Sequence, residues 1–210
     1  LQKYYEEEYS FKMASQDIIN VLDEIGIQKA HFVGVSLGTI IIRTIGEIQP
    51  ERVQSLVMCG AIMRLNIRSR FLVGLGHMFK KVIPFMWLYK LFAWIILPKK
   101  RHSESRNLFI REAKKLYKKE FIKWFNMTHE VNPLLKYFRE KELKTRTLYI
   151  MGSEDYLFLP PVKNIVKEHT KSVLEVVEKC GHVVNVEKPD IFNRITLNFL
   201  KSNNFGSSTS

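Results

Sequence analysis

A glycine-flanked serine between two apolar segments constrains this chain more than any other feature. An apolar run from Ala30 leads into Gly34-Val35-Ser36-Leu37-Gly38, and an apolar stretch with helical character follows at 39–50. This order predicts a buried strand, a tight turn and a helix. Side chains at positions 34 and 38 would crowd such a turn, so we expect glycine there for steric reasons. The turn would present the Ser36 hydroxyl at the carboxyl edge of the strand.

The rest of the chain alternates between strand and helix patterns. We predict strands at 53–58, 145–152 and 172–179, and helices at 13–25, 161–169 and 189–200. Ser15 is the candidate N-cap of the first helix, and Gly26 can end it. This alternation predicts an α/β fold, with a mostly parallel sheet flanked by helices.

One long segment interrupts the alternation and predicts a helical cap inserted between strands. Residues 62–143 are aromatic and basic, with helix breaks expected at Pro84, Pro98 and Pro133. We therefore divide the chain into a core (1–61 and 144–203), a cap (62–143) and a disordered tail (204–210).

The net charge of +12 belongs to the predicted cap. Residues 62–123 hold 16 Lys and Arg against three acidic residues, whereas the rest holds 17 against 18. Such a segment can attract anionic lipid headgroups, although its apolar run 82–98 is too short and interrupted to span a membrane. A solvated helical face explains the charge equally well. No recognition motif accompanies the charge, so we expect no nucleic-acid binding.

Two further residues could complete a nucleophilic site, since a serine hydroxyl needs a base. His182 follows a predicted strand, and Gly181 lets its loop turn the imidazole inward. Asp155 also follows a strand and could orient this base, with Glu154 as the near alternative. Serine, aspartate and histidine in this order, each just after a strand, predict one reaction centre.

The remaining candidates are weaker. The backbone N–H of Leu37, at a helix N-terminus, can stabilise an oxyanion. His31 is interpreted as structural, and a surface role is the default for four other histidines: His77, His102, His129 and His169. The two cysteines, Cys59 and Cys180, form no disulfide framework or metal-ligand pattern. We therefore expect no metal, no organic cofactor and a reducing, cytoplasmic compartment.

Three segments of the chain resemble the α/β-hydrolase superfamily. GVSLG resembles its nucleophile elbow, RTLYIMGSEDYLFLP its acid-bearing strand and loop, and KCGHVVNVEKPDIFNRITLNFL its histidine loop and last helix. The resemblance implies a serine hydrolase that cleaves a small-molecule ester or related acyl compound through an acyl-enzyme. Ser36 argues against the similar haloalkane dehalogenases, which use an aspartate at this position.

One part of the family pattern is not found before Ser36. The family opens with several strands and a His-Gly loop that supplies a second oxyanion N–H, whereas LQKYYEEEYSFKMAS is polar and short. We therefore expect the Ser36 strand to be an edge, with the missing part supplied by an upstream segment or a second chain. Hydrolysis by this chain alone should be weak, since losing one oxyanion donor costs on the order of a hundredfold in rate.

The cap aromatics give the only hint of substrate. They could line an apolar pocket for a hydrophobic acyl group, or equally pack the cap's own core: Phe71, Phe85, Trp87, Phe92 and Trp94. Two other functions stay open. One is a lipase-like enzyme at a membrane surface, and the other is a catalytically inactive α/β-hydrolase fold that binds a ligand or partner.

Overall fold

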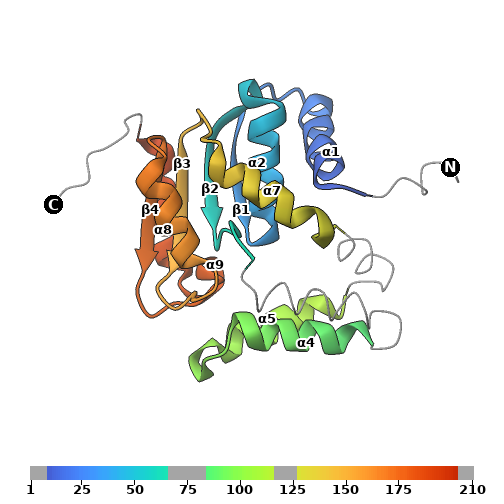
Figure 1. Ribbon diagram of the computed structural model, residues 1–210, viewed down its shortest axis with the longest axis vertical. Helices are drawn as coiled ribbons and strands as arrows, with labels where there is room; N and C mark the ends of the chain where they lie inside the picture. The colour runs from blue at the N-terminus through green and yellow to red at the C-terminus, as the bar shows by residue number, and fades with distance from the viewer. Residues whose placement is uncertain (1–8, 66–83, 116–126, 203–210) are drawn as a thin grey trace, which may run out of the picture.

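A parallel sheet forms the centre of the molecule (Figure 1). The computed structural model describes residues 9–65, 84–115 and 127–202, and within them the sheet has four strands. They are β1 (Ala30–Val35), β2 (Val53–Cys59), β3 (Thr147–Gly152) and β4 (Ser172–Val177), in the order β1-β2-β3-β4. Every neighbouring pair is parallel, so all four carboxyl ends meet at one edge of the sheet.

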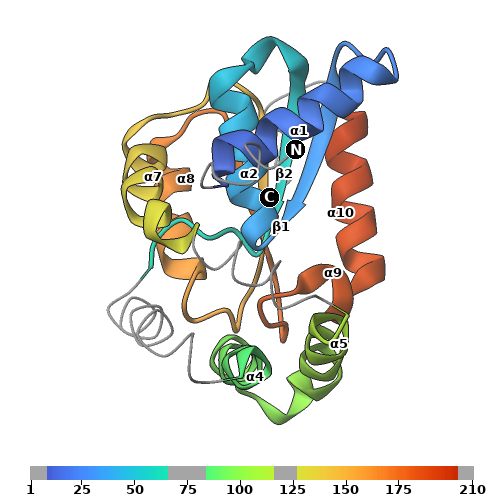
Figure 2. The same ribbon diagram turned by 90° about the vertical axis from the view of Figure 1, so that its right-hand side faces the viewer.

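Helices cover both faces of this sheet (Figure 2). One face packs against α1 (Phe11–Glu24), α2 (Leu37–Ile48), α7 (Thr128–Glu140) and α8 (Leu159–Glu168). The other face packs against α9 (Val184–Glu187) and α10 (Pro189–Lys201). A 3-10 turn, η2 (Pro50–Arg52), leads from α2 into β2. The predicted α/β fold with a parallel sheet is confirmed.

A pair of helices lies beyond the carboxyl edge of the sheet (Figure 1). It consists of α4 (Phe85–Ile96), the 3-10 turn η3 (Lys100–His102) and α5 (Ser103–Ala113), which we call the cap helices. They come from the middle of the segment predicted as a cap. No helix in the described ranges is long and apolar enough to cross a membrane.

The core consists of two hydrophobic clusters, one on each face of the sheet. In β2, Leu56 and Met58 belong to the larger cluster, whereas Val57 and Cys59 belong to the smaller one. This alternation follows from the two-residue period of a strand. All four side chains are fully buried, as expected for a parallel sheet that is covered on both faces.

Two sequence predictions about helices are wrong. Ser15 is not an N-cap: it lies buried within α1, and its hydroxyl is hydrogen-bonded to the carbonyl oxygens of Phe11 (2.8 Å) and Ile41 (3.0 Å). The cap is Ser10, whose Oγ accepts the N–H of Met13 at 3.1 Å. The helix therefore starts at Phe11, two residues earlier than its apolar pattern indicated.

The second error is Pro133, which was expected to break a helix and lies inside α7. Proline removes one backbone hydrogen bond from a helix interior. Here the helix is held by burial, because Val131, Leu135 and Phe138 belong to the larger hydrophobic cluster. The same packing ties α7 to the sheet, although its residues lie in the segment predicted as the cap.

The strand that carries the serine lies at the edge of the described sheet. β1 pairs with β2 alone among the described strands, as the sequence led us to expect. The side chain of Val33 in β1 is 46 % exposed, an unusual exposure for an apolar residue in a parallel sheet.

Glycine is required on only one side of the serine. A Cβ atom on Gly34 would lie 2.7 Å from the Gly38 carbonyl oxygen and 2.9 Å from Ile42 Cδ1. A Cβ atom on Gly38 would meet nothing within 4 Å, so the expected crowding at position 38 is wrong. The turn brings position 34 onto the first turn of α2, whereas position 38 faces open space.

This difference gives a paired stability test. Gly34→Ala should lower the free energy of unfolding by about 1–3 kcal/mol, because the new methyl group overpacks the turn. Gly38→Ala should change it by less than about 1 kcal/mol. Urea unfolding followed by circular dichroism measures both variants. Equal losses would contradict the steric explanation.

Candidate active site

Ser36 lies in a strained turn between β1 and α2. Its φ of 52° is in the left-handed region, where a residue other than glycine carries a cost of about 1–3 kcal/mol. Hydrogen bonds on both sides hold this conformation: the Ser36 N–H donates to the Cys59 carbonyl oxygen (2.9 Å), and the Ser36 carbonyl oxygen accepts from Thr39 N (2.9 Å) and Oγ1 (2.6 Å). The turn thus fixes where the hydroxyl points.

Ser36, His182 and Asp155 form a continuous hydrogen-bonded chain. His182 Nε2 lies 2.9 Å from Ser36 Oγ, and His182 Nδ1 lies 2.7 Å from Asp155 Oδ2. The aspartate and the histidine are each only 2 % exposed. Because a carboxylate only accepts hydrogen bonds, Nδ1 carries the proton and Nε2 is left to accept the serine O–H.

Glycines at two strand ends make room for the histidine loop. A Cβ atom on Gly60, where φ is +56°, would lie 2.5 Å from the His182 carbonyl oxygen. A Cβ atom on Gly152 would lie 2.0 Å from the Gly181 carbonyl oxygen. No sequence pattern predicted a role for these glycines, although Gly60 lies just after one predicted strand and Gly152 ends another. They allow backbone to pack directly against the loop that holds the imidazole.

Glu154, the alternative acid, does not reach His182 and contacts the cap helices instead. Its carboxylate lies 3.0 Å from Lys99 Nζ and 3.1 Å from His102 Nε2, and it also contacts Arg101. Burial alone would raise the pKa of this carboxyl, but hydrogen bonds from Lys99 and His102 outweigh it and hold the pKa below its ordinary value.

The other histidines divide into three groups. His31 lies in β1, with Nδ1 2.7 Å from Ser55 Oγ, which agrees with a structural role. His102 and His169 are buried, so the surface role expected for them is wrong. His77 and the side chain of His129 lie outside the described residues.

Leu37 is the first residue of α2, directly after the serine. The first N–H groups of a helix have no acceptor within the helix, and they lie at the positive end of its dipole. The Leu37 N–H is therefore suited to an oxyanion that forms beside Ser36. The second donor that the resemblance implies stays a prediction.

The cap aromatics are not enclosed by the described residues. Trp87 and Trp94 are 68 % and 56 % exposed, and the Trp94 ring lies 3.7 Å from the Arg106 guanidinium carbon. Phe92 is half-buried, and the side chains of Phe71 and Phe85 lie outside the described residues. The prediction that these residues line a substrate pocket stays a prediction.

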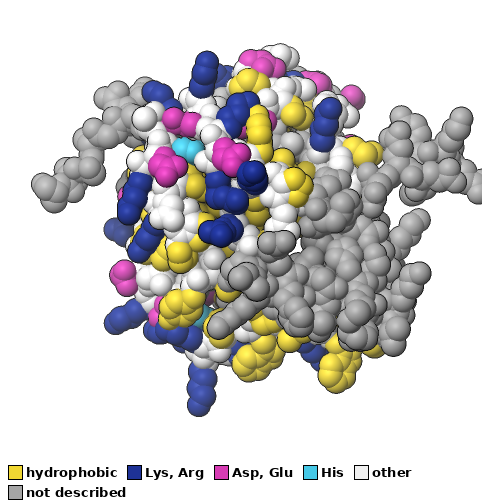
Figure 3. All heavy atoms as spheres, in the orientation of Figure 1, with side chains coloured by type: hydrophobic (Ala, Val, Ile, Leu, Met, Phe, Trp, Pro, Cys, Tyr) yellow, Lys and Arg dark blue, Asp and Glu magenta, His cyan; other side chains and the backbone are white. Residues whose placement is uncertain are grey.

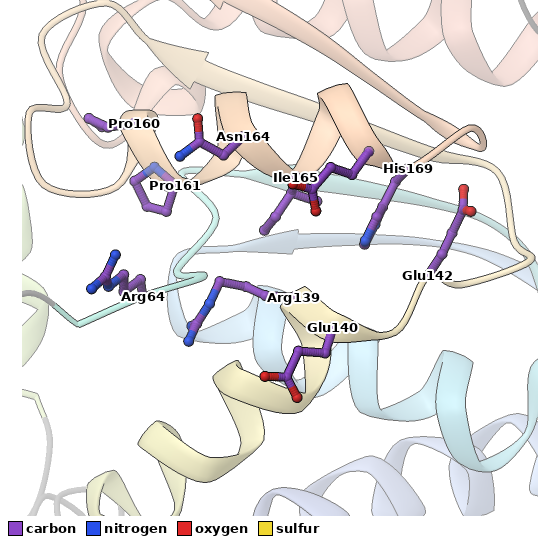
Figure 4. A pocket seen from close by; sticks show the side chains of 10 residues that line it. Arg64, Arg139, Glu140, Glu142, Pro160, Pro161, Asn164, Ile165 and His169 are labelled. Atoms are coloured by element: carbon purple, nitrogen blue, oxygen red, sulfur yellow. The ribbon is translucent and has the colours of Figure 1, made fainter.

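A hollow of about 610 Å³ lies away from the hydrogen-bonded chain (Figure 4). Pro160, Pro161 and Asn164 of α8 line one side of it, and Arg139 and Arg64 lie opposite. Its lining includes none of Ser36, Asp155 and His182, and it mixes arginines with glutamates. We therefore do not place the reaction there.

Neither cysteine is suited to act as a nucleophile. Both are fully buried, and burial raises the pKa of Cys59 to about 11 and that of Cys180 to about 12. The thiolate is the reactive form, so both thiols are inert at neutral pH. Within the described part of the chain, no cluster of three or more His, Cys, Asp or Glu side chains could hold a metal ion.

This inertness can be tested with Ellman's reagent. At pH 8 the folded protein should react over hours rather than minutes, because only about one Cys59 thiol in a thousand is ionised. Raising the pH toward 11 should speed the reaction, and unfolding in guanidinium should expose both thiols at once. Rapid reaction of the folded protein at pH 8 would contradict the burial of these side chains.

Comparison with known proteins agrees with this fold. A family profile described as "alpha/beta hydrolase fold" matches residues 2–74. The 2-hydroxy-6-oxononadienedioate/2-hydroxy-6-oxononatrienedioate hydrolase of Comamonas testosteroni is 28 % identical over 204 residues, which cover 89 % of this chain and 68 % of that protein.

Solved structures show the same fold. A hydrolase from Pseudomonas aeruginosa PA01 superposes with a TM-score of 0.79 at 19 % identity, covering 93 % of this chain and 74 % of that one. An esterase from Exiguobacterium antarcticum gives a TM-score of 0.75 at 16 % identity, covering 93 % and 75 %. The protein therefore has the α/β-hydrolase fold, and its residues 2–74 are similar in sequence to the family of that name.

Proposed function

We propose that this protein is a serine hydrolase that cleaves a carboxylic ester or a related acyl compound. The observation that carries the proposal is the hydrogen-bonded chain from Ser36 through both nitrogens of His182 to Asp155. The proposal is supported by relatives named as hydrolases and by a structural neighbour named as an esterase.

The reaction proceeds in two halves. In the first, Ser36 Oγ attacks the acyl carbon while His182 Nε2 takes its proton, and Asp155 stabilises the imidazolium. The Leu37 N–H donates to the oxyanion of the tetrahedral intermediate. This intermediate collapses to an acyl-enzyme as His182 gives its proton to the leaving alcohol. In the second half, His182 activates a water molecule, which releases the acid and restores the serine.

The triad is tested by substitution. Ser36→Ala should abolish labelling by a fluorophosphonate probe, because the probe forms a bond to the activated serine oxygen. Asp155→Asn should slow hydrolysis of 4-nitrophenyl acetate on the order of 10⁴-fold, since the amide favours the wrong imidazole tautomer. His31→Gln is the matched control and should keep the wild-type rate. A folded wild-type protein that is not labelled would favour a ligand-binding protein over an enzyme.

A second candidate is an enzyme that works at a membrane surface, and one feature of the cap helices favours it. Trp87, Leu91 and Trp94 recur at helical spacing on α4, and each is more than 40 % exposed. Exposed lysines and arginines surround this stripe: Lys90, Lys100, Arg101, Lys114 and Lys115. Figure 3 shows hydrophobic and basic side chains together at the end of the molecule formed by α4 and α5. Exposed tryptophans beside basic residues suit a lipid interface.

Vesicle sedimentation tests this candidate. The wild type should bind vesicles that contain phosphatidylserine at low salt and be released at high salt, because attraction to anionic headgroups is screened. Trp87→Ser with Trp94→Ser should weaken binding about tenfold or more. Val21→Ser with Ile25→Ser is the matched control, since both side chains are 60 % exposed, Val21 in the last turn of α1 and Ile25 directly after it. Equal binding by the two double variants would argue against the stripe.

A further inference from the structure

The described cap helices contain one histidine, His102. Its side chain is fully buried. Its Nε2 lies 3.1 Å from Glu154 Oε2 and 3.8 Å from Glu187 Oε2. Both carboxylates come from the core: Glu154 precedes the triad aspartate, and Glu187 ends α9 after the histidine loop. One imidazole of the cap therefore reaches the two loops that carry the triad's acid and base.

The contact with Glu154 ties the cap helices to the acid loop. Lys99 and Arg101 bind the other oxygen of this carboxylate, so it is held as an anion and His102 Nε2 carries the proton that it accepts. The backbone N–H of Glu154 donates to the Cys180 carbonyl oxygen at 2.9 Å. The acid loop and the histidine loop are thus joined directly beside the imidazole.

The contact with Glu187 reaches the residue before the catalytic base. Glu187 Oε2, the oxygen that faces His102, accepts the Gly181 N–H at 2.9 Å. The imidazole also packs on Gly181, because a Cβ atom there would lie 3.0 Å from both Cε1 and Nε2 of His102. Gly181 is therefore confined by the ring of His102 and by the Glu187 carboxylate that accepts its N–H.

We propose that His102 is a positioning residue that holds the His182 loop in its hydrogen-bonding geometry, through its hydrogen bond to Glu154 and its packing against Gly181 beside the Glu187 carboxylate. The inference rests on the proposed hydrolase function. It assigns the cap helices a role at the reaction centre without contact with the substrate. The loop is held fully only while His102 is seated between the two carboxylates.

Two substitutions at position 102 separate the hydrogen bond from general packing. The amide nitrogen of glutamine can take the place of Nε2, so His102→Gln should preserve the hydrogen bond to Glu154. The asparagine side chain is one carbon shorter and its amide cannot reach the position of Nε2, so His102→Asn should break this hydrogen bond. Asn107→Ala is the control, because Asn107 is an exposed residue of α5.

Hydrogen exchange and turnover are then measured on the whole chain. His102→Asn should raise the amide exchange rate of peptides covering 178–187 about tenfold or more. It should also lower kcat for a nitrophenyl ester roughly tenfold to a hundredfold with little change in KM, because the base is misplaced while the substrate site is intact. His102→Gln and Asn107→Ala should stay within about twofold of the wild type in both measurements.

The two readouts distinguish the possible failures. Unchanged exchange and kcat in His102→Asn overturn the inference, and so does equal damage by glutamine and asparagine. If the wild type shows neither turnover nor fluorophosphonate labelling, the proposed function fails, whereas the exchange rates still decide whether His102 holds the loop. If His102→Asn does not fold, Glu187→Gln replaces it, since a weaker acceptor for the Gly181 N–H should raise exchange of the same peptides.

Discussion

The backbone conformation at Ser36 is the constraint on which the rest of the site depends. A serine with a positive φ has a strained backbone. This conformation persists only because β1, β2 and α2 pack around it. The Ser36 N–H is held by the Cys59 carbonyl oxygen of the neighbouring strand, and α2 can approach because Gly34 has no side chain. Local strain is thus balanced by sheet pairing and close packing, and the result is a hydroxyl with a fixed direction.

Parallel pairing explains why the other members of the triad arrive at the same place. β1, β3 and β4 end at one edge of the sheet, so the loops after them meet there, although Ser36 and His182 lie 146 residues apart in the chain. Their approach needs more than topology. At Gly60 and Gly152 a Cβ atom would lie 2.5 Å and 2.0 Å from carbonyl oxygens of the histidine loop, so any other residue would push this loop away. The spacing of the three hydrogen-bonded side chains therefore depends on backbone packed directly against backbone.

Charged and hydrogen-bonding side chains join the cap helices to the core. Glu154 is buried, and its charge is balanced by Lys99, Arg101 and a hydrogen bond from His102. Partly exposed ion pairs contribute little by themselves, but removing the partners of a buried carboxylate leaves an uncompensated charge. This geometry favours one position of the cap over others, and it leaves the tryptophan stripe of α4 on the outside.

The sequence by itself determined the α/β class and the three side chains that the structure joins by hydrogen bonds. Strand period, a glycine-flanked serine and polar residues after strands are local patterns, and they predicted β1 to β4 and the order Ser36, Asp155, His182. Tertiary structure alone decided the rest. Pro133 stays in a helix because the core buries its neighbours. Position 38 is not crowded, because a Cβ atom there would face open space. His102 is buried beside two carboxylates that come from distant segments of the chain. No local sequence pattern predicts this contact.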